Sequence, residues 1–588
     1  MNTKHFKFVV LTLILVAAMV APSFAVNAQG DVKREDTVIF DIDSDSIADP
    51  YNFNYFVPGT ARNQGMHQAV WEPLFILNYE TGEIQPWLGV SFEPNETLDV
   101  WTLKLREGIK WQDGEDFNAD DVIWTINFLK DPDNITFNEA AGMNQWVESV
   151  EKVDDLTVRF NLTAPNPRFQ LDYFSVRIWG SVLIMPEHVF SQVDDVATFT
   201  FYDPEKGWPF GTGPYKLVSA SETEFIYDRD DNWWGAQTGW MDLPEPLRLE
   251  FIITGPEEQK ALLMSNHELD SAMDITLGAF EAIQARNPNV IAWYDELPYA
   301  WFDPCPRQLS LNHTVSPWDN PEMRKAVSLI VDRNQIIEIA YEGTSKPSKT
   351  IFVEYGGMMP YINAIGDAGL WVAPEGNVEA GQALIEANGW TMNGDGFYEK
   401  DGKVLSLDIQ THEAFIEKRR IANVIVEQLR AAGIDTTTRA VAGGTFTDNI
   451  AFGNFEGVID WEACHSVNEP WGSMNRYNVR WYREVGERSP SNHNFVRWNT
   501  EGAQRYSEIV DAMGVLPLGD PQIVDMVVEA YQIFMDEQVV IPISQARKLV
   551  PFDTTYWVGW PTAKNNYNHP ATWWNSTHQI IHNLHKAE

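Results

Sequence analysis

The chain has 588 residues, of which 42 are basic and 84 are acidic, and its formal net charge is −42. At roughly 100–200 residues per domain this length predicts several lobes, and a hydrophobic content of 44% excludes a disordered chain. The negative charge argues against binding to nucleic acid or to anionic lipid, because both need a cationic footprint.

The first element along the chain is a candidate export signal. Lys4 and Lys7 precede a run at 8–20 that is apolar apart from one threonine, and Ala-x-Ala-like cleavage sites follow. We predict a signal peptide at 1–28, cleaved after Ala28, with an uncleaved anchor helix as the alternative. No Cys lies near this site, and no later segment reaches the roughly 18 apolar residues of a membrane span. The sequence predicts an exported, soluble, periplasmic or extracytoplasmic protein that is not a lipoprotein.

Strand-like and helix-like segments alternate through the rest of the chain, which predicts an α/β fold. Apolar and polar residues alternate over 101–106, as in a half-buried strand. Asn118 can cap the helix that follows, with Asp120 and Asp121 in its first turn facing the positive end of the helix dipole.

Three further elements have clear boundary signals. Asn320 followed by Pro321 predicts the start of a helix, because a capping side chain and an N-terminal proline both favour that position. A longer helix is expected at about 413–432, followed by a strand at 434–441. The Asn-Gly-Asp-Gly turn that opens 393–407 predicts a hairpin.

Motifs of common enzymes are missing from the sequence. It has no glycine-rich phosphate loop, no Gly-x-Ser-x-Gly elbow and no His-Glu-x-x-His pair. Four acidic residues at first resemble a calcium loop: Asp41, Asp43, Asp45 and Asp49. However, Ser46 stands where that loop needs glycine, and Asn52 where it needs a bidentate glutamate. The sequence therefore predicts no metal, no cofactor and no enzymatic activity.

Several sequence blocks follow one another in a familiar order. They include 71–75 (WEPLF), 101–127 (WTLKLREGIKWQDGEDFNADDVIWTIN), 211–215 (GTGPY), 309–343 and 428–434 (QLRAAGI). Together they resemble the extracytoplasmic solute-binding proteins of ABC importers, family 5. That family is the oligopeptide-, dipeptide- and nickel-binding class, and it also includes oligosaccharide-binding members.

The resemblance implies an α/β periplasmic-binding-protein clamshell of the cluster C type, with two lobes, a hinge and an extra subdomain on the first lobe. The expected main subdomain of lobe I comprises 29–75, 207–303 and 543–588. The extra subdomain is expected at 76–206, and lobe II at 304–542. Such a protein would be a monomer that encloses its ligand between the lobes and delivers it to ABC permease transmembrane subunits.

The ligand is expected to be an oligosaccharide or an oligopeptide. Oligopeptide binders of this family carry an Asp that pairs with the α-ammonium of the ligand, and the aligned residue here is Ser466 or Cys464. Neither can neutralise a buried ammonium, although Asp460, Glu462 or Glu469 could substitute. The 24 Trp residues offer flat faces for sugar rings, so the sequence slightly favours the oligosaccharide.

The resemblance and the residue chemistry together suggest seven ligand contacts: Phe56, Trp71, Trp461, Glu462, Asn468, Glu469 and Trp471. The two tryptophans of 461–471 would stack on the ligand, and the polar residues would hydrogen-bond to hydroxyls or to an ammonium. For each residue, structural packing or a loop position is the alternative. Cys305 and Cys464 can form a disulfide in an oxidising compartment or remain two thiols. A secreted hydrolase and a surface scaffold protein are the alternative functional classes.

Overall fold

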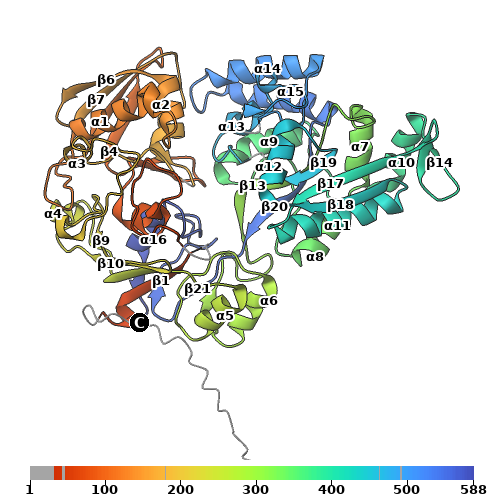
Figure 1. Ribbon diagram of the computed structural model, residues 1–588. Coiled ribbons are helices and arrows are strands. Elements are labelled where there is room, and N and C mark those ends of the chain that lie inside the picture. The colour runs from red at the N-terminus through yellow and green to blue at the C-terminus, as the bar shows by residue number, and fades with distance from the viewer. Residues whose placement is uncertain (1–31, 43–46, 179, 462–463, 491–492) are drawn as a thin grey trace, which may run out of the picture.

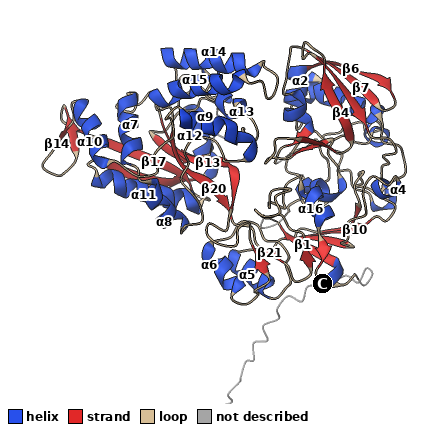
Figure 2. Ribbon diagram, turned by 180° about the vertical axis from the view of Figure 1, so that it is seen from behind, coloured by secondary structure: helices blue, strands red, loops and turns tan. Residues whose placement is uncertain are grey.

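The computed structural model describes residues 32–588 except 43–46, 179, 462–463 and 491–492. The predicted signal peptide, Asp43, Asp45 and Glu462 lie outside the described residues. The chain forms two lobes side by side, each with its own sheets and helices (Figures 1 and 2). Two long antiparallel strands join them: β13 (Trp301–Leu311) leads into the second lobe, and β20 (Ile541–Lys548) leads back.

A four-stranded mixed sheet forms the base of the first lobe. Its strands, in spatial order, are β1 (Thr37–Asp41), β11 (Arg248–Ile252), β10 (Glu224–Arg229) and β9 (Tyr215–Ala220). Every residue of β1 is buried, as expected for a strand covered on both faces. The short β12 (Val290–Ile291) pairs with β21 (Phe552–Asp553), so the C-terminal segment returns to this lobe. The helices beside it are α5 (Glu257–Ser265), α6 (Leu277–Gln284) and α16 (Thr577–Asn583).

A second sheet of the first lobe lies farther from the joining strands. Its strands, in spatial order, are β4 (Gly89–Pro94), β5 (Val100–Leu105), β7 (Thr157–Leu162) and β6 (Val147–Asp154), with α1 (Ala119–Lys130) and α2 (Ala140–Trp146) beside it. The predicted half-buried strand is confirmed, because Trp101, Leu103 and Leu105 of β5 are buried and their neighbours are not. Asn118 caps α1 as predicted: its Oδ1 accepts from Asp120 N at 2.8 Å.

A small sheet links this region to the interior. It contains β3 (Ile84–Pro86), β2 (Phe75–Leu77) and β8 (Ser175–Val176), and β2 pairs in parallel with β8. Just before β8 lies the short helix η5 (Gln170–Phe174). This helix and the loop after β8 provide part of the cavity described below.

The second lobe is built on a five-stranded sheet. Its spatial order is β18 (Asp435–Val441), β17 (Ser406–His412), β19 (Gly457–Asp460), β13 and β20. Its helices are α7 (Pro321–Ile330), α8 (Arg333–Tyr341), α9 (Met359–Asp367), α10 (Val378–Ala387), α11 (Ile416–Ala431), α12 (Gly443–Phe452), α13 (Trp471–Asn475), α14 (Glu501–Gly514) and α15 (Gln522–Asp536). The predicted hairpin is a three-stranded sheet of β14 (Thr391–Met392), β15 (Tyr398–Lys400) and β16 (Lys403–Val404).

The predicted start of α7 is confirmed, with the Asn320 side chain capping and Pro321 in the first turn. The predicted start of the helix at about 413 is early, because α11 begins at Ile416. The residue before it, Phe415, has an extended backbone and packs edge-on against Trp461 at 4.7 Å between ring centroids. Among the described residues, no helix has both the length and the apolar character needed to cross a bilayer.

Candidate functional site

A cavity of about 580 Å³ opens in the first lobe, between its base sheet and the region of the second sheet. Its wall combines residues from 55–68, residues 172, 173, 177 and 180–182, and residues 573–575 just before α16. The aromatic side chains in the wall include Tyr55, Tyr173, Trp573 and Trp574. Most of the other lining side chains are polar, and a concave site that combines aromatic surface with polar groups suits a small molecule.

His67 and Asn575 form a hydrogen-bonded pair in the cavity wall. His67 Nδ1 lies 3.1 Å from Asn575 Oδ1. Burial lowers the pKa of His67 well below its usual value, so the ring is neutral and donates through Nδ1. This leaves His67 Nε2 as an acceptor and the Asn575 amide nitrogen as a donor, and neither has a partner among the described residues.

Two more lining side chains have a polar atom without a hydrogen-bond partner among the described residues. Gln64 Oε1 and Ser181 Oγ are buried and also lack a hydrogen-bond partner within the described part of the chain. Because buried polar groups are nearly always paired in native proteins, four such atoms in one cavity wall indicate a place where bound water or a ligand supplies the partners. The four offer donors and acceptors without net charge.

The charged residues of the wall carry both signs. Arg62 donates to the Tyr55 carbonyl at 2.8 Å, and its guanidinium lies 5.6 Å from the centre of the Tyr55 ring. Arg177 and Asp172 form an ion pair at 3.2 Å. Burial raises the pKa of Asp172, and the Arg177 charge opposes this shift. Glu139 also lines the cavity.

Asp41, the first residue of the apparent calcium loop, lines the cavity as well, but protein groups satisfy its carboxylate. Lys260 Nζ lies 2.7 Å from Oδ2, Thr254 donates to Oδ1 at 2.5 Å and the Met273 amide donates to Oδ2 at 3.1 Å. Within the described residues, no group of three or more His, Cys, Asp or Glu side chains is placed to hold a metal ion. Asp41 thus ties the end of β1 to its neighbours.

Phe56, an expected ligand contact, does not line this cavity. Its ring is fully buried, with centroids 4.6 Å from Phe128, 5.5 Å from Phe190 and 6.0 Å from Trp124. An aromatic cluster surrounds the Phe56 ring, so its contacts in the structure are packing contacts. Asn54 fixes the loop, since its Oδ1 accepts from the Phe56 amide at 3.0 Å.

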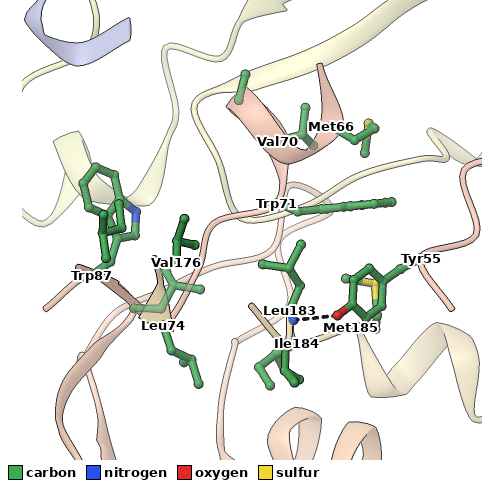
Figure 3. Close-up of a cluster of buried hydrophobic side chains, with 14 of the residues drawn as sticks. Tyr55, Met66, Val70, Trp71, Leu74, Trp87, Val176, Leu183, Ile184 and Met185 are labelled. Carbon is green, nitrogen blue, oxygen red and sulfur yellow. Dashed lines mark hydrogen bonds between the residues drawn. The ribbon is translucent and has the colours of Figure 1, made fainter. Parts of the chain in front are cut away.

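Trp71, the second expected contact, is also a core residue. Only 2% of its surface is exposed, and its indole nitrogen donates to the Phe210 carbonyl at 3.0 Å. Figure 3 shows the Trp71 ring packed among apolar side chains that include Val70 and Leu183. Its role in the structure is packing behind the cavity wall.

Trp461 lies in the second lobe, where cationic side chains cover its indole. Lys418 Nζ lies 2.9 Å from the ring centre, and the Arg307 guanidinium lies 5.5 Å away. Stacking of a ligand on the face of the Trp461 ring that Lys418 covers would therefore require Lys418 to move. Cys305 and Cys464 form a disulfide bond, which ties the segment beside Trp461 to β13.

The remaining predicted residues lie where the two lobes touch. Glu469 is buried, and its carboxylate pairs with Arg168 of the first lobe at 3.2 Å. The same guanidinium lies 5.0 Å from the centre of the Trp471 ring. Asn468 is beside Gly82 of the first lobe, where an added Cβ would come within 3.7 Å of Asn468 Cβ.

Ser466, which aligns with the ammonium-binding Asp of peptide binders, is buried and has a structural role. Its hydroxyl donates to the Pro470 carbonyl at 2.9 Å and accepts from the Ser473 amide at 3.0 Å. His465, Asn468, Glu469 and Trp471 therefore form part of the contact between the lobes, whereas the cavity is lined by residues of the first lobe. The link between the two is Arg177, which lines the cavity and donates to the His465 carbonyl at 3.5 Å.

Reasoning from sequence missed Trp573, Trp574 and Asn575. Asn575 meets His67 across 508 positions of sequence, so no local spacing could have paired them. The only available signal was the high tryptophan content of the chain, which does not single out positions.

Curated relatives with sequence similarity include glutathione-binding proteins. GsiB of Pectobacterium atrosepticum is 25% identical over 303 residues, which cover 51% of this chain and 52% of that protein. GsiB of Escherichia coli K12 is 26% identical over 302 residues, with the same coverage. The chain thus matches about half the length of these relatives.

Solved structures with the same fold cover nearly the whole chain. A periplasmic oligopeptide-binding protein of Thermotoga maritima matches with a TM-score of 0.79 at 22% identity, over 94% of this chain and 100% of its own. Its mannohexaose-bound form gives a TM-score of 0.72 at 22% identity, over 94% and 99%. NikA of Brucella suis, in complex with Fe(III)-EDTA, gives 0.72 at 20% identity, over 94% and 100%.

These likenesses establish a two-lobed binding-protein fold of mixed α/β content, as the sequence predicted. The family model for bacterial extracellular solute-binding proteins, family 5 (middle), matches residues 83–478. This range covers parts of both lobes and most of the sequence blocks on which the resemblance rests. The chain therefore belongs to family 5 of the bacterial extracellular solute-binding proteins.

Proposed function

We propose that this protein is the substrate-binding subunit of an ABC importer, and that it captures an oligosaccharide and delivers it to the permease subunits in the membrane. The observation that carries the ligand class is the cavity of about 580 Å³, whose wall combines aromatic rings with unpaired, uncharged hydrogen-bonding groups. In this proposal the protein is exported through its signal peptide and works as a monomer.

A sugar matches this wall in two ways. Each hydroxyl both donates and accepts, so it can pair with the His67 acceptor and the Asn575 donor together. Trp573 and Trp574, with ring centroids 5.3 Å apart, offer aromatic surface to the apolar faces of sugar rings. Mannohexaose is bound by the structural neighbour from Thermotoga maritima.

An oligopeptide is the second candidate ligand. Glu139 lines the same cavity and would have to pair with the α-ammonium of a peptide, since Arg177 already pairs with Asp172. Glu469 is less suited to that role, since Arg168 already neutralises it. Curated relatives with sequence similarity include glutathione-binding proteins, so the experiment below also includes glutathione and short peptides.

The test is a thermal-shift panel on the mature protein, followed by calorimetric titration of every hit. Manno-, cello- and xylo-oligosaccharides stand beside glutathione and di- to pentapeptides. We expect the melting temperature to rise with at least one oligosaccharide series, because only the folded site binds. Asn575→Ala should weaken binding of that sugar about tenfold, as expected when a buried hydrogen-bonding partner is left unpaired.

Asn583→Ala is the matched control, because Asn583 lies on α16 outside the cavity lining and its side chain donates to the Gln579 carbonyl one turn earlier. It should leave sugar affinity unchanged. A shift with peptides alone would replace the oligosaccharide by the second candidate. A flat melting temperature across the whole panel would contradict both.

A further inference from the structure

The two lobes meet at a second place, away from the joining strands. Figure 1 shows α14 and the sheet of β4–β7 at the ends of the two lobes that lie opposite the joining strands. Arg168, in the loop after β7, reaches across this gap into the second lobe. It donates to the Gly514 carbonyl at 2.8 Å and to Glu469 Oε2 at 3.2 Å, and its guanidinium lies against the Trp471 ring.

Within the described part of the chain, the hydrogen bonds and the ring contact of the Arg168 side chain are all with the second lobe. The Gly514 carbonyl ends α14, where the helix dipole favours a cation. Only 2% of the Arg168 side chain and 6% of the Glu469 side chain are exposed. Separating the two would leave each buried charge without its partner, which is costly. The contact therefore depends on both lobes being in this arrangement.

The segment that carries Arg168 also forms the cavity wall. The Asp172 amide donates to the Arg168 carbonyl at 2.7 Å, which makes 168–172 a single turn. Asp172 and Tyr173 line the cavity, and Asp172 pairs with Arg177, which itself reaches the His465 carbonyl in the second lobe. One short segment thus contacts both the cavity and the opposite lobe.

We propose that Arg168 is a positioning residue that holds the two lobes closed over the cavity, and that ligand contacts to Asp172 and Arg177 strengthen this hold. Arg168 does not line the cavity itself. It acts through the turn 168–172 and through Glu469, which caps α13 by accepting from the Trp471 amide at 2.9 Å. The coupling to ligand rests on the function proposed above, whereas the closure between lobes does not.

The closure explains why the sequence segment around Glu469 and Trp471 has the chemistry of a binding site without lining the cavity. Its carboxylate and indole bind a guanidinium from the same chain. In this proposal ligand release requires the lobes to part, so the strength of this contact should set the dissociation rate more than the association rate.

The test compares Arg168→Met with Arg505→Met in the full mature protein. Arg505 is an exposed arginine that bonds Glu508 and Glu529 within the second lobe, so it controls for loss of a charge without loss of a lobe contact. Small-angle X-ray scattering measures the radius of gyration with and without ligand. Stopped-flow displacement measures the dissociation of whichever panel ligand binds.

We expect Arg168→Met to increase the radius of gyration and to raise the dissociation rate constant at least about tenfold, with the association rate constant nearly unchanged. Arg168→Lys, which keeps the charge but not both donor positions, should recover part of each effect. Arg505→Met should match the wild type. Glu469→Gln removes the charge and keeps an oxygen for the α13 cap, so it decides the question if Arg168→Met does not fold.

A scattering profile that Arg168→Met and Glu469→Gln leave unchanged, both without ligand and at saturating ligand, would overturn the closure role. If the variants expand the protein but no panel ligand binds, the closure role stands and the proposed function fails. If a ligand binds with unaltered dissociation and scattering in the variants, the proposed function stands and the closure role fails.

Discussion

Glu72 is a buried carboxylate with no basic partner in hydrogen-bonding contact among the described residues. Its two oxygens accept from the indole nitrogens of Trp87 and Trp234, each at 2.9 Å. Burial raises the pKa of Glu72 to about 7, and the indole donors oppose part of that shift. Glu72 therefore links two segments of the first lobe, 73–87 and 233–240. The free energy of keeping its carboxyl group buried depends on pH.

The raised pKa gives a signed prediction. The folded protein favours protonated Glu72 more than the unfolded chain does, so its stabilising contribution is present below the ordinary value of 4.5 and is lost as pH rises through about 7. Glu72→Gln removes this titration. We expect wild type to lose about 3 kcal/mol of unfolding free energy relative to Glu72→Gln between about pH 4.5 and pH 8, measured by urea denaturation.

Comparing the two proteins at each pH cancels the titration of every other group. The amide nitrogen of Gln cannot accept, so one indole donor loses its partner, which adds an offset that does not vary with pH. Parallel stability profiles for the two proteins would show that the pKa of Glu72 is the same in the folded and unfolded states and would contradict the prediction.

At the same residue scale, the sequence could indicate chemistry but not position. Trp71 and Trp461 have the side chains that a sugar site uses, yet one is a core residue and Lys418 covers the other. What distinguishes them from Trp573 is tertiary contact, which no single-residue pattern contains. Glu469 has the right charge for an ammonium, and only the position of Arg168, 301 residues away, explains how it is used.

At the scale of elements, local signals predicted helix starts well where a capping side chain was present. Asn118 and Asn320 both cap helices as predicted. The start of α11 was misplaced because no side chain caps it, and the contact of Phe415 with Trp461 instead lies at its first turn. The order of strands in each sheet is known only from the structure, since spacing alone does not give it.

The cap of α1 can be tested directly. Asn118 Oδ1 accepts from the backbone amide of Asp120, and the backbone amide of Asn118 donates to Asp121 Oδ2 at 3.0 Å. Asn118→Ala removes the first bond and keeps the second. We expect a loss of about 1 kcal/mol in unfolding free energy by urea denaturation, with an unchanged dependence on urea concentration.

Asn118→Ser is the control for the cap, because a serine hydroxyl can accept from the same amide. It should retain most of the stability. Equal losses in the alanine and serine variants would mean that the asparagine stabilises the protein through its volume or its contact with Asp116, and not through the cap.

At the scale of the whole molecule, charge is the property that sequence fixes without reference to the fold. With 84 acidic and 42 basic residues, at least 42 carboxylates have no basic side chain of their own to pair with. Many of the ion pairs that do form are exposed, such as Lys33–Glu35 and Arg505–Glu508. Exposed pairs contribute little, so repulsion among carboxylates should dominate the response to salt.

Salt should therefore stabilise this protein. At about 0.1 M ionic strength the screening length falls to about 10 Å, which weakens repulsion across the surface more than attraction within close pairs. We expect the melting temperature to rise steadily as NaCl increases from about 0.02 M to about 0.5 M, measured by calorimetry at constant pH. Sucrose at matched osmolality controls for solvent exclusion. If the melting temperature fell with NaCl, the ion pairs would outweigh the repulsion, and the excess of acidic residues would not be a net cost to the folded state.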